Sequence, residues 1–447
     1  MKKITFNSYL SNIVFIAVLF FCLPMILASL GGLSTAGSYI RALLCFFILT
    51  IVSASLLLGR RYVKFYSFTF FVIAMLGLIH YILLVNPSYF SSNGSPVESF
   101  WGEYQSVFNS VESVIGDKRA NGLFYFNRQS FEVTHPEIWN IISFPMFFLQ
   151  HKWMNYSPLN VFSMQIASMN IILIYNKFNP GVEGNKNNAR KILLYTTAFF
   201  PMGLLNGVMW RDPFGMLLIS TGLALITLSN TFVRRVLSFI ILVVFSYVQR
   251  TVYSIIGAVT VLFKEFINKK SVAAIINIPL TLVALFIVTQ YFQETTSEDY
   301  ITGYLNDKSF MYFPVKLFAG LIGPFPWTQF SQYFMGNLSM AYQPADYLIG
   351  TFQLGYLFAL IMNWKNFSFK NLDYMTIMGF GIMLSGFMTK HLHIGYIYEG
   401  LYFTLPWFFK QIGSRYWKYF GYAFTVLVLL NVVAIGLGGF GISSSWK

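Results

Sequence analysis

The stretch from Arg234 to Arg250, RRVLSFIILVVFSYVQR, decides the fold class. It opens on a basic doublet, continues into an apolar run from Ile240 to Val248, and stops at Arg250. A helix of about 20 apolar residues crosses the hydrocarbon core of a bilayer. Cytoplasmic loops of membrane proteins hold an excess of Lys and Arg. The stretch therefore predicts a membrane-spanning helix with its doublet in the cytoplasm and Arg250 on the opposite side.

The same sorting of charge holds along the chain. One alternate set of connectors between apolar spans collects basic residues, and nearly all carboxylates fall in the other set. The basic connectors hold Lys2-Lys3, Arg60-Arg61, Lys186/Arg190/Lys191, Arg234-Arg235, Lys269-Lys270, Lys365/Lys370 and Arg415/Lys418. On this topology 19 basic and 3 acidic residues lie inside, against 11 basic and 13 acidic residues outside. The net charge of +14 thus reflects topology and gives no reason to expect nucleic-acid binding.

The composition excludes a soluble domain. Of 447 residues, 56% are hydrophobic and 10% charged, and the mean hydropathy is +0.60. Cys22 and Cys45 lie inside apolar spans, so neither a disulfide framework nor a metal site is expected. The residues after Lys2-Lys3 resemble a signal peptide, but Ala28-Ser29-Leu30-Gly31 is a poor cleavage site and further spans follow at once. We expect an uncleaved first helix.

Apolar runs predict an all-α polytopic membrane protein with about 12 to 14 transmembrane helices. The thirteen spans lie near residues 12–30, 39–58, 65–85, 158–176, 191–209, 213–230, 235–250, 252–268, 272–291, 344–363, 372–390, 395–410 and 418–438. With the N-terminus inside, they place every basic doublet in the cytoplasm. Residues 138–150 are apolar but short, and we expect them to dip from the outer face. The alternative is that this segment crosses and one later weak span does not.

Two long outer loops, residues 86–137 and 293–343, interrupt these spans within a single integral membrane domain. Loops longer than about 12–15 residues are usually functional or disordered. Both loops are rich in aromatic residues, which argues against disorder. We expect both to fold back onto the outer rim of the helices.

Two arginines end apolar spans on the outer side, where the positive-inside rule gives no reason for them. Arg211 and Asp212 lie in Trp210-Arg211-Asp212-Pro213, which joins two spans with almost no loop, and Arg250 closes the next outward connector. Charges at membrane depth are candidates for function. The alternatives are an interfacial ion pair at a helix start and a snorkelling anchor. Guanidinium groups bind phosphate oxygens bidentately, so a pair of them suits a diphosphate.

A third polar group follows at Lys390-His391-Leu392-His393, with Tyr398 and Glu399 shortly after it. Histidine can act as a general base near neutral pH, and Glu399 is an ionisable group inside an apolar stretch. Two interfacial histidines at a helix end are the alternative. Zinc would lack a convincing third ligand.

Weaker candidates lie in the outer loops. His135 and Glu137 end the first loop, and Lys316 and Trp327 lie in the second; ordinary loop chemistry explains them as well. Aromatic side chains of the loops can stack on sugar rings, although interfacial belts explain most of them. The chain has no P-loop, dinucleotide fingerprint, nucleophile elbow or zincin motif, which counts against energy-coupled pumping and soluble-type hydrolysis.

Over roughly residues 130 to 410 the chain resembles the Wzy-like polymerases of O-antigen and exopolysaccharide repeat units. The matching pieces are Phe200-Pro201 followed by Trp210-Arg211-Asp212-Pro213, the span that ends at Arg250, and Gly323-Pro324-Phe325-Pro326-Trp327. Thr134-His135-Pro136-Glu137 is similar to a His-Pro step of the wider GT-C glycosyltransferases. Three spans, not one, precede the first large loop, so the catalytic aspartate of GT-C enzymes is not transferred to this chain.

The resemblance implies a GT-C-like glycosyltransferase of the bacterial inner membrane, with its active site on the periplasmic side and a role in lipopolysaccharide or other polysaccharide biosynthesis. It would move a growing glycan from undecaprenyl pyrophosphate onto a lipid-linked repeat unit, and a chain-length regulator and a flippase are implied as partners. Arg211, Arg250, Lys390 and Lys316 would bind the pyrophosphate, with Asp212 orienting Arg211. His391, His393 or Glu399 would be the base, and His135, Glu137, Trp327 and Tyr398 would contact the glycan. No cofactor or metal is expected.

Two other functions remain open. A GT-C enzyme that uses a polyprenyl-monophosphate sugar should depend on an outer-loop carboxylate more than on paired arginines. A flippase for lipid-linked oligosaccharides should carry charges deep in a central cavity, and few spans here have them.

Overall fold

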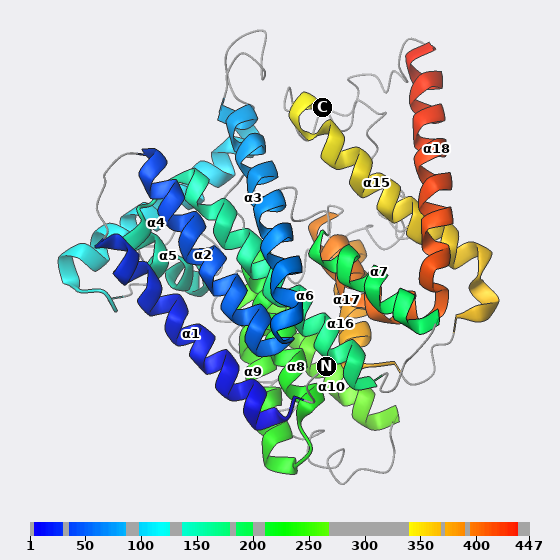
Figure 1. Cartoon of the computed structure of the whole chain (residues 1–447), viewed down its shortest axis with the longest axis horizontal. Helices are drawn as coiled ribbons and strands as arrows, with labels where there is room; N and C mark the ends of the chain where they lie inside the picture. Colours follow the sequence, from blue (N-terminus) through cyan, green and yellow to red (C-terminus); the bar gives the residue numbers. More distant parts are fainter. Residues whose placement is uncertain are drawn as a thin grey trace. The chain divides into compact units, whose positions relative to one another are not determined.

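The structure is a computed structural model, and it describes residues 4–29, 35–85, 98–125, 136–178, 185–199, 211–267, 339–367, 372–388 and 394–436. These residues are helical and contain no strand (Figure 1). They form two compact units. Unit 1 contains α1 to α6, α8, α9 and the start of α10, and unit 2 contains α7, the rest of α10 and α15 to α18.

Unit 1 contains mostly apolar helices, apart from the polar α4, and includes only the start of α10. Their bounds are α1 Phe6–Ala28, α2 Thr35–Leu57, α3 Val63–Val85, α4 Glu98–Asn121, α5 Pro136–Leu149, α6 Tyr156–Phe178, α8 Asp212–Leu228, α9 Phe232–Gln249 and α10 Thr251–Ile267. Short 3₁₀ turns precede α3 at Arg60–Tyr62 and α6 at Trp153–Asn155. Among the described residues of the whole chain, five helices are long and apolar enough to cross a membrane: Phe6–Ala28, Gly37–Leu57, Arg60–Ile79, Tyr156–Phe178 and Phe232–Gln249. The multi-pass membrane class is thus supported.

Helix α6 forms the centre of unit 1. All of its residues from Tyr156 to Tyr175 are buried, although several are polar. Asn170 accepts a hydrogen bond from the Tyr9 hydroxyl of α1 (2.7 Å) and donates to Ser220 and Thr221 of α8 (3.1 Å each). Polar side chains commonly join helices in this way inside membranes. They fix α1, α6 and α8 against one another.

Contacts within unit 1 set the directions of its helices. The Asn12 amide of α1 donates to the Leu56 carbonyl at the end of α2 (3.1 Å). The Arg234 guanidinium of α9 lies 5.3 Å from the centre of the Phe6 ring. The start of α1, the end of α2 and the start of α9 therefore share one end of the unit, as the alternating topology predicts. That this end faces the cytoplasm stays a prediction.

Helices α8 and α9 form a tightly packed antiparallel hairpin (Figure 1). A Cβ atom on Gly222 of α8 would lie 2.9 Å from the Leu242 Cα atom of α9, so only glycine permits this approach. At the Arg234 end, the hydroxyls of Ser229 and Ser238 are hydrogen bonded (2.8 Å). A span of 17 residues, about 25 Å long, separates this end from the start of α8.

Two helices modify the expectation for the first outer loop and the segment that follows. Part of the loop forms α4, a helix of 24 residues that packs against α5. Residues 138–150 largely coincide with α5, whose 14 residues span about 21 Å, less than the roughly 30 Å hydrocarbon core. That α5 dips from the outer face stays a prediction.

Unit 2 is also helical. Its further helices are α7 Asn185–Ala198, α15 Ser339–Met362, α16 Tyr374–Met388, α17 Ile394–Ile412 and α18 Tyr416–Gly436. Short 3₁₀ turns lie at Trp364–Asn366 and Gly413–Arg415. Glycines bring α16 and α17 together, because a Cβ on Gly379 would lie 2.7 Å from the Gly400 carbonyl oxygen. The predicted span 272–291 and most of the second outer loop lie outside the described residues, so the total helix count stays a prediction.

Candidate functional site

The first part of the candidate site is the start of α8. Asp212 is the first residue of the helix, followed by Pro213, whose missing N–H and fixed φ suit the first turn. A carboxylate here also complements the positive end of the helix dipole. The Asp212 side chain is nevertheless only 2% exposed, which is rare for an aspartate without cationic partners.

The second part is the end of α9. Gln249 is its last residue, and Arg250 follows in an extended conformation before α10 begins at Thr251. The Arg250 backbone N–H still donates to the Ser246 carbonyl (2.9 Å). With almost no loop between α9 and α10, Arg250 remains at the end of the hairpin beside the start of α8.

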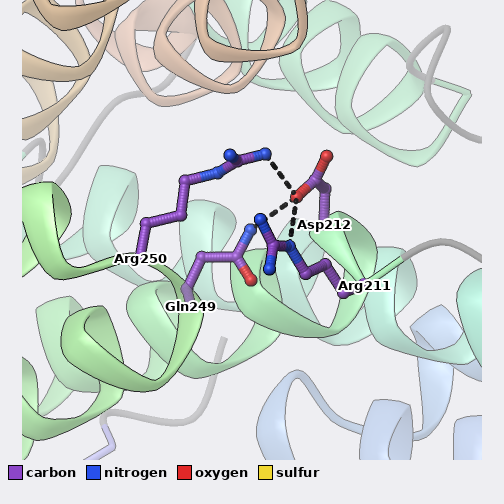
Figure 2. Close-up of polar contacts among 4 residues, drawn as sticks. All are labelled: Arg211, Asp212, Gln249 and Arg250. Atoms are coloured by element: carbon purple, nitrogen blue, oxygen red, sulfur yellow. Dashed lines mark hydrogen bonds and ion pairs between the residues drawn. The ribbon is translucent and has the colours of Figure 1, made fainter. Parts of the chain in front are cut away.

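Side chains from both parts converge on Oδ1 of Asp212 (Figure 2). Arg250 Nη2 donates to it at 3.1 Å, and Gln249 Nε2 donates at 2.7 Å. Arg211 Nε lies 3.9 Å from the same oxygen, within ion-pair distance. Arg250 also lies over the Tyr253 ring, 5.9 Å from its centre. The structure brings Arg211, Asp212 and Arg250 together, while their role in binding a pyrophosphate stays a prediction.

The electrostatics of these four side chains favour an anion. Two guanidiniums and one carboxylate leave one positive charge in excess within the group. The arginine side chains are only 14% and 15% exposed, so water screens their charge less than it does at an open surface. A buried carboxylate between them lowers the cost of holding two cations in place. The arrangement can therefore bind an oxyanion with preorganised donors.

The structure differs from the expectation in one detail. Asp212 was expected to orient Arg211, its neighbour in sequence, yet Arg250 is the nearer cation. Arg211 and Asp212 are adjacent at a helix start, where successive side chains point in different directions. The carboxylate of Asp212 turns toward α9, so its main partners come from there.

The other predicted site residues divide into two groups. Glu137, Tyr398 and Glu399 lie in described helices: Glu137 is half-buried in the first turn of α5, while Tyr398 and Glu399 are buried in α17 of unit 2. The rest lie outside the described residues, namely His135, Lys316, Trp327, Lys390, His391 and His393. Their proposed roles stay predictions.

Gln249 and Gly215 were not predicted as site residues. Gln249 is fully buried against Gly215 in the first turn of α8. A neutral amide at the end of a span gives no charge signal, and a glycine in an apolar helix is common. Their only sequence signal was adjacency to the charged residues, since Gln249 precedes Arg250 and Gly215 lies one helical turn after Asp212.

His151 is a second polar side chain that the sequence did not single out. It lies between α5 and α6, and its ring stacks on Phe108 of α4 with ring centres 3.8 Å apart. Nε2 donates to the Phe108 carbonyl (3.0 Å), so Nδ1 accepts from the Tyr156 hydroxyl (2.7 Å). Burial lowers the pKa of His151 from 6.5 to about 4, despite the bond to the carbonyl. A neutral histidine therefore joins α4 to the start of α6.

Comparisons with known proteins do not assign the chain to a family. No protein-family model, curated protein or solved structure matches it.

Proposed function

We propose that this protein is an O-antigen-type polysaccharide polymerase of the bacterial inner membrane. It transfers a growing glycan from undecaprenyl pyrophosphate to a lipid-linked repeat unit at the periplasmic face. The motif resemblance supports this proposal. The observation that carries it is the pair of arginines that converge on buried Asp212, at the end of the α8–α9 hairpin opposite Arg234.

The chemistry of the transfer requires cations at the leaving group. An acceptor hydroxyl oxygen forms a bond to the anomeric carbon while the bond from that carbon to the pyrophosphate oxygen breaks. The electron pair leaves with undecaprenyl pyrophosphate, and the hydroxyl proton goes to a base. In this proposal Arg211 and Arg250 stabilise the departing charge, with Lys390 and Lys316 as support. Glu399, His391 or His393 takes the proton.

In the proposal, the Asp212 carboxylate allows two arginines to lie close together in a region of low dielectric constant. Two unpaired guanidiniums held close together would repel each other, and burying charge without a partner is costly. One carboxylate lowers that cost but cannot neutralise both cations. In the proposal, a diphosphate offers several oxygens to the guanidinium forks.

The position of these charges also bears on the rival functions. The arginines lie at one end of a hairpin and not along its length, which is unlike the deep charged cavity expected of a flippase. In the proposal, the lipid tail of the substrate stays in the bilayer while the diphosphate reaches Arg211 and Arg250. A chain-length regulator and a flippase of the same pathway are the proposed partners.

The test replaces each arginine in cells and measures polymer length. Arg211→Ala, Arg250→Ala and the double variant are expressed in a strain that lacks the native protein, with Arg234→Ala as a matched control from the other end of α9. We expect single repeat units on the lipid acceptor for the Arg211 and Arg250 variants, and normal polymer for the Arg234→Ala control. Unchanged long chains in the double variant, at normal protein levels, would rule out the polymerase role of the pair.

A further inference from the structure

The turn that follows α4 displays a large apolar side chain. Residues 122–125 form this segment, which we name the α4 turn, and the side chain of Phe124 within it is 88% exposed. The neighbouring Tyr125 is exposed as well. Single exposed apolar residues are common on folded proteins. The role of this turn therefore has to be judged from the residues around it.

Hydrogen bonds hold the α4 turn in one conformation. Gly122 has a φ of +104°, which residues with a Cβ atom rarely adopt. The Tyr125 N–H donates to the Gly122 carbonyl (2.9 Å). The ammonium of Lys118, in the last turn of α4, donates to the carbonyls of Leu123 and Tyr125 (3.2 Å each). The side chain of Phe124 therefore projects from a fixed backbone.

The burial of Lys118 indicates what surrounds this turn. Its side chain is only 4% exposed, although lysine is rarely buried. In water the carbonyls of a turn are hydrated, and burying an ammonium beside them costs free energy. Inside a bilayer no water reaches the backbone, so the same carbonyls need donors from the protein. A lysine that donates to two carbonyls of one turn suits a turn at membrane depth.

The aromatic neighbours of Phe124 lie beside a membrane-spanning helix. The Phe124 and Phe144 rings have centres 6.3 Å apart, and the Phe144 ring of α5 meets Phe21 of α1 edge-on at 4.8 Å. Helix α1 is one of those long and apolar enough to cross a membrane. Phe21 precedes its last residue, Ala28, by seven residues, or about 10 Å. In a helix that crosses a hydrocarbon core about 30 Å thick, this position lies at the depth of the acyl chains.

The exposed face of α1 provides the apolar surface that Phe124 extends. Phe21, Met25 and Ile26 are exposed in the last turns of this helix. In a multi-pass membrane protein such a face contacts lipid. Through Phe144, the ring of Phe124 lies next to that face and projects outward like it.

We propose that the α4 turn anchors the first outer loop in the bilayer, with Phe124 among the acyl chains and Lys118 bonded to the carbonyls of the turn. The partner is the lipid surface at this end of α1. This inference rests on the membrane class of the protein and does not depend on the polymerase function.

The experiment places a fluorophore at the turn and asks whether lipid or water surrounds it. Phe124→Cys is made in the full-length protein with both native cysteines replaced (Cys22→Ala and Cys45→Ala). It is labelled with a nitrobenzoxadiazole maleimide and reconstituted into phosphatidylcholine nanodiscs. We expect blue-shifted emission, loss of fluorescence with lipids that carry a doxyl group on the acyl chain, and protection from aqueous iodide.

Ser113→Cys is the matched control, because Ser113 lies on the exposed side of the same helix. Its label should be quenched by iodide and little affected by doxyl lipids. Equal iodide quenching at the two positions would overturn the inference, since water would then surround Phe124. Protection of the Phe124→Cys label from both quenchers would also overturn it, because protein would then cover the turn.

A second probe leaves the native cysteines in place. Phe124→benzoylphenylalanine in otherwise wild-type protein is irradiated in the same nanodiscs, and the products are identified by mass spectrometry. We expect crosslinks to phosphatidylcholine acyl chains, and few from Ser113→benzoylphenylalanine. Equal lipid crosslinking from the two positions would contradict the anchor.

The task of Lys118 is tested by removing its ammonium. Lys118→Met keeps the apolar stem, and we expect iodide to reach the Phe124→Cys label in this background. Arg119→Met removes a cation from the next, exposed position of α4 and should leave the label protected. Unchanged protection in the Lys118→Met background would overturn the assignment of Lys118 to the turn.

Discussion

The two ends of the α8–α9 hairpin are joined by different kinds of side-chain contact. At one end two neutral hydroxyls, Ser229 and Ser238, join the helices, and Arg234 bonds to the exposed Asn230 side chain (2.9 Å). At the other end a buried carboxylate gathers two arginines and a glutamine. The hydroxyl pair shows that this hairpin can be closed without buried charge. The charged end therefore needs a reason beyond stability, because buried ion pairs seldom stabilise more than apolar packing does.

Removing the carboxylate should give the largest effect. Asp212→Ala takes away the anion that both guanidiniums face and the acceptor of Gln249. We expect the unfolding free energy to fall by on the order of 2–3 kcal/mol, somewhat below the value for a fully buried pair because the arginines are partly exposed. Thermal unfolding of the purified protein measures this, with Ser238→Ala as the matched variant. A midpoint no lower than that of Ser238→Ala would show that the charged end contributes no more to the free energy of unfolding than the hydroxyl end does.

Replacing arginine by lysine should reduce polymer formation at the Arg250 end of the hairpin and leave it unchanged at the Arg234 end. Lysine keeps the charge but loses the planar fork that binds phosphate oxygens bidentately. We expect Arg250→Lys to reduce polymer about tenfold, which corresponds to ~1.4 kcal/mol, while Arg234→Lys leaves polymer unchanged. Gel profiles of the glycan give the readout. Equal glycan profiles for the two lysine variants would show that polymer formation does not depend on the planar guanidinium group of Arg250.

The middle of the hairpin should respond to size and not to charge. Gly222→Ala would force a Cβ against the Leu242 backbone, and overpacking of this kind costs about 1–3 kcal/mol. Aggregation temperature in detergent measures it, with Gly421→Ala as a control in open space. If Gly222→Ala is as stable as that control, the close approach of α8 and α9 is not needed.

Acid should weaken the contact that His151 makes with α4. Because the folded pKa of His151 is lowered to about 4 from 6.5, only the unfolded or detached state gains a proton between these values. The contact is complete above pH 6.5 and is lost as the pH falls toward 4, and nearby Arg119 and Lys152 disfavour the proton further. Hydrogen exchange of α4 should rise over this range. A His151→Gln variant with the same pH dependence would exclude His151 as the cause.

The smallest effect is expected at the hydroxyl pair. Ser238→Ala removes one hydrogen bond, but Ser229 still donates to the Leu225 carbonyl (2.8 Å). We expect a loss of about 0.5–1 kcal/mol in unfolding free energy and no change in polymer. Shortened polymer in this variant would mean that the Arg234 end also serves the transfer.

The sequence predicted those features that depend on order along the chain. Apolar runs predicted the membrane-spanning class, and five described helices are long and apolar enough to cross a membrane. The charges at span ends on the predicted outer side made Arg211, Asp212 and Arg250 candidates for one anion site. The rotation of each helix about its axis was not predictable, because it depends on packing such as that of Gly222 on Leu242. For this reason Gln249 and Gly215 were missed, and Arg250 replaced Arg211 as the nearer partner of Asp212. Helix α4 was missed because a polar, aromatic-rich stretch carries no apolar periodicity.

Binding of undecaprenyl pyrophosphate to Arg250→Ala and Arg234→Ala tests the central claim most directly. Arg234 lies in the first turn of α9 and Arg250 directly follows its last residue, so the two variants change opposite ends of the same hairpin. The account predicts at least about tenfold weaker binding for Arg250→Ala, as expected for the loss of a charge-assisted pair, and wild-type affinity for Arg234→Ala. Equal affinities for the two variants would contradict it.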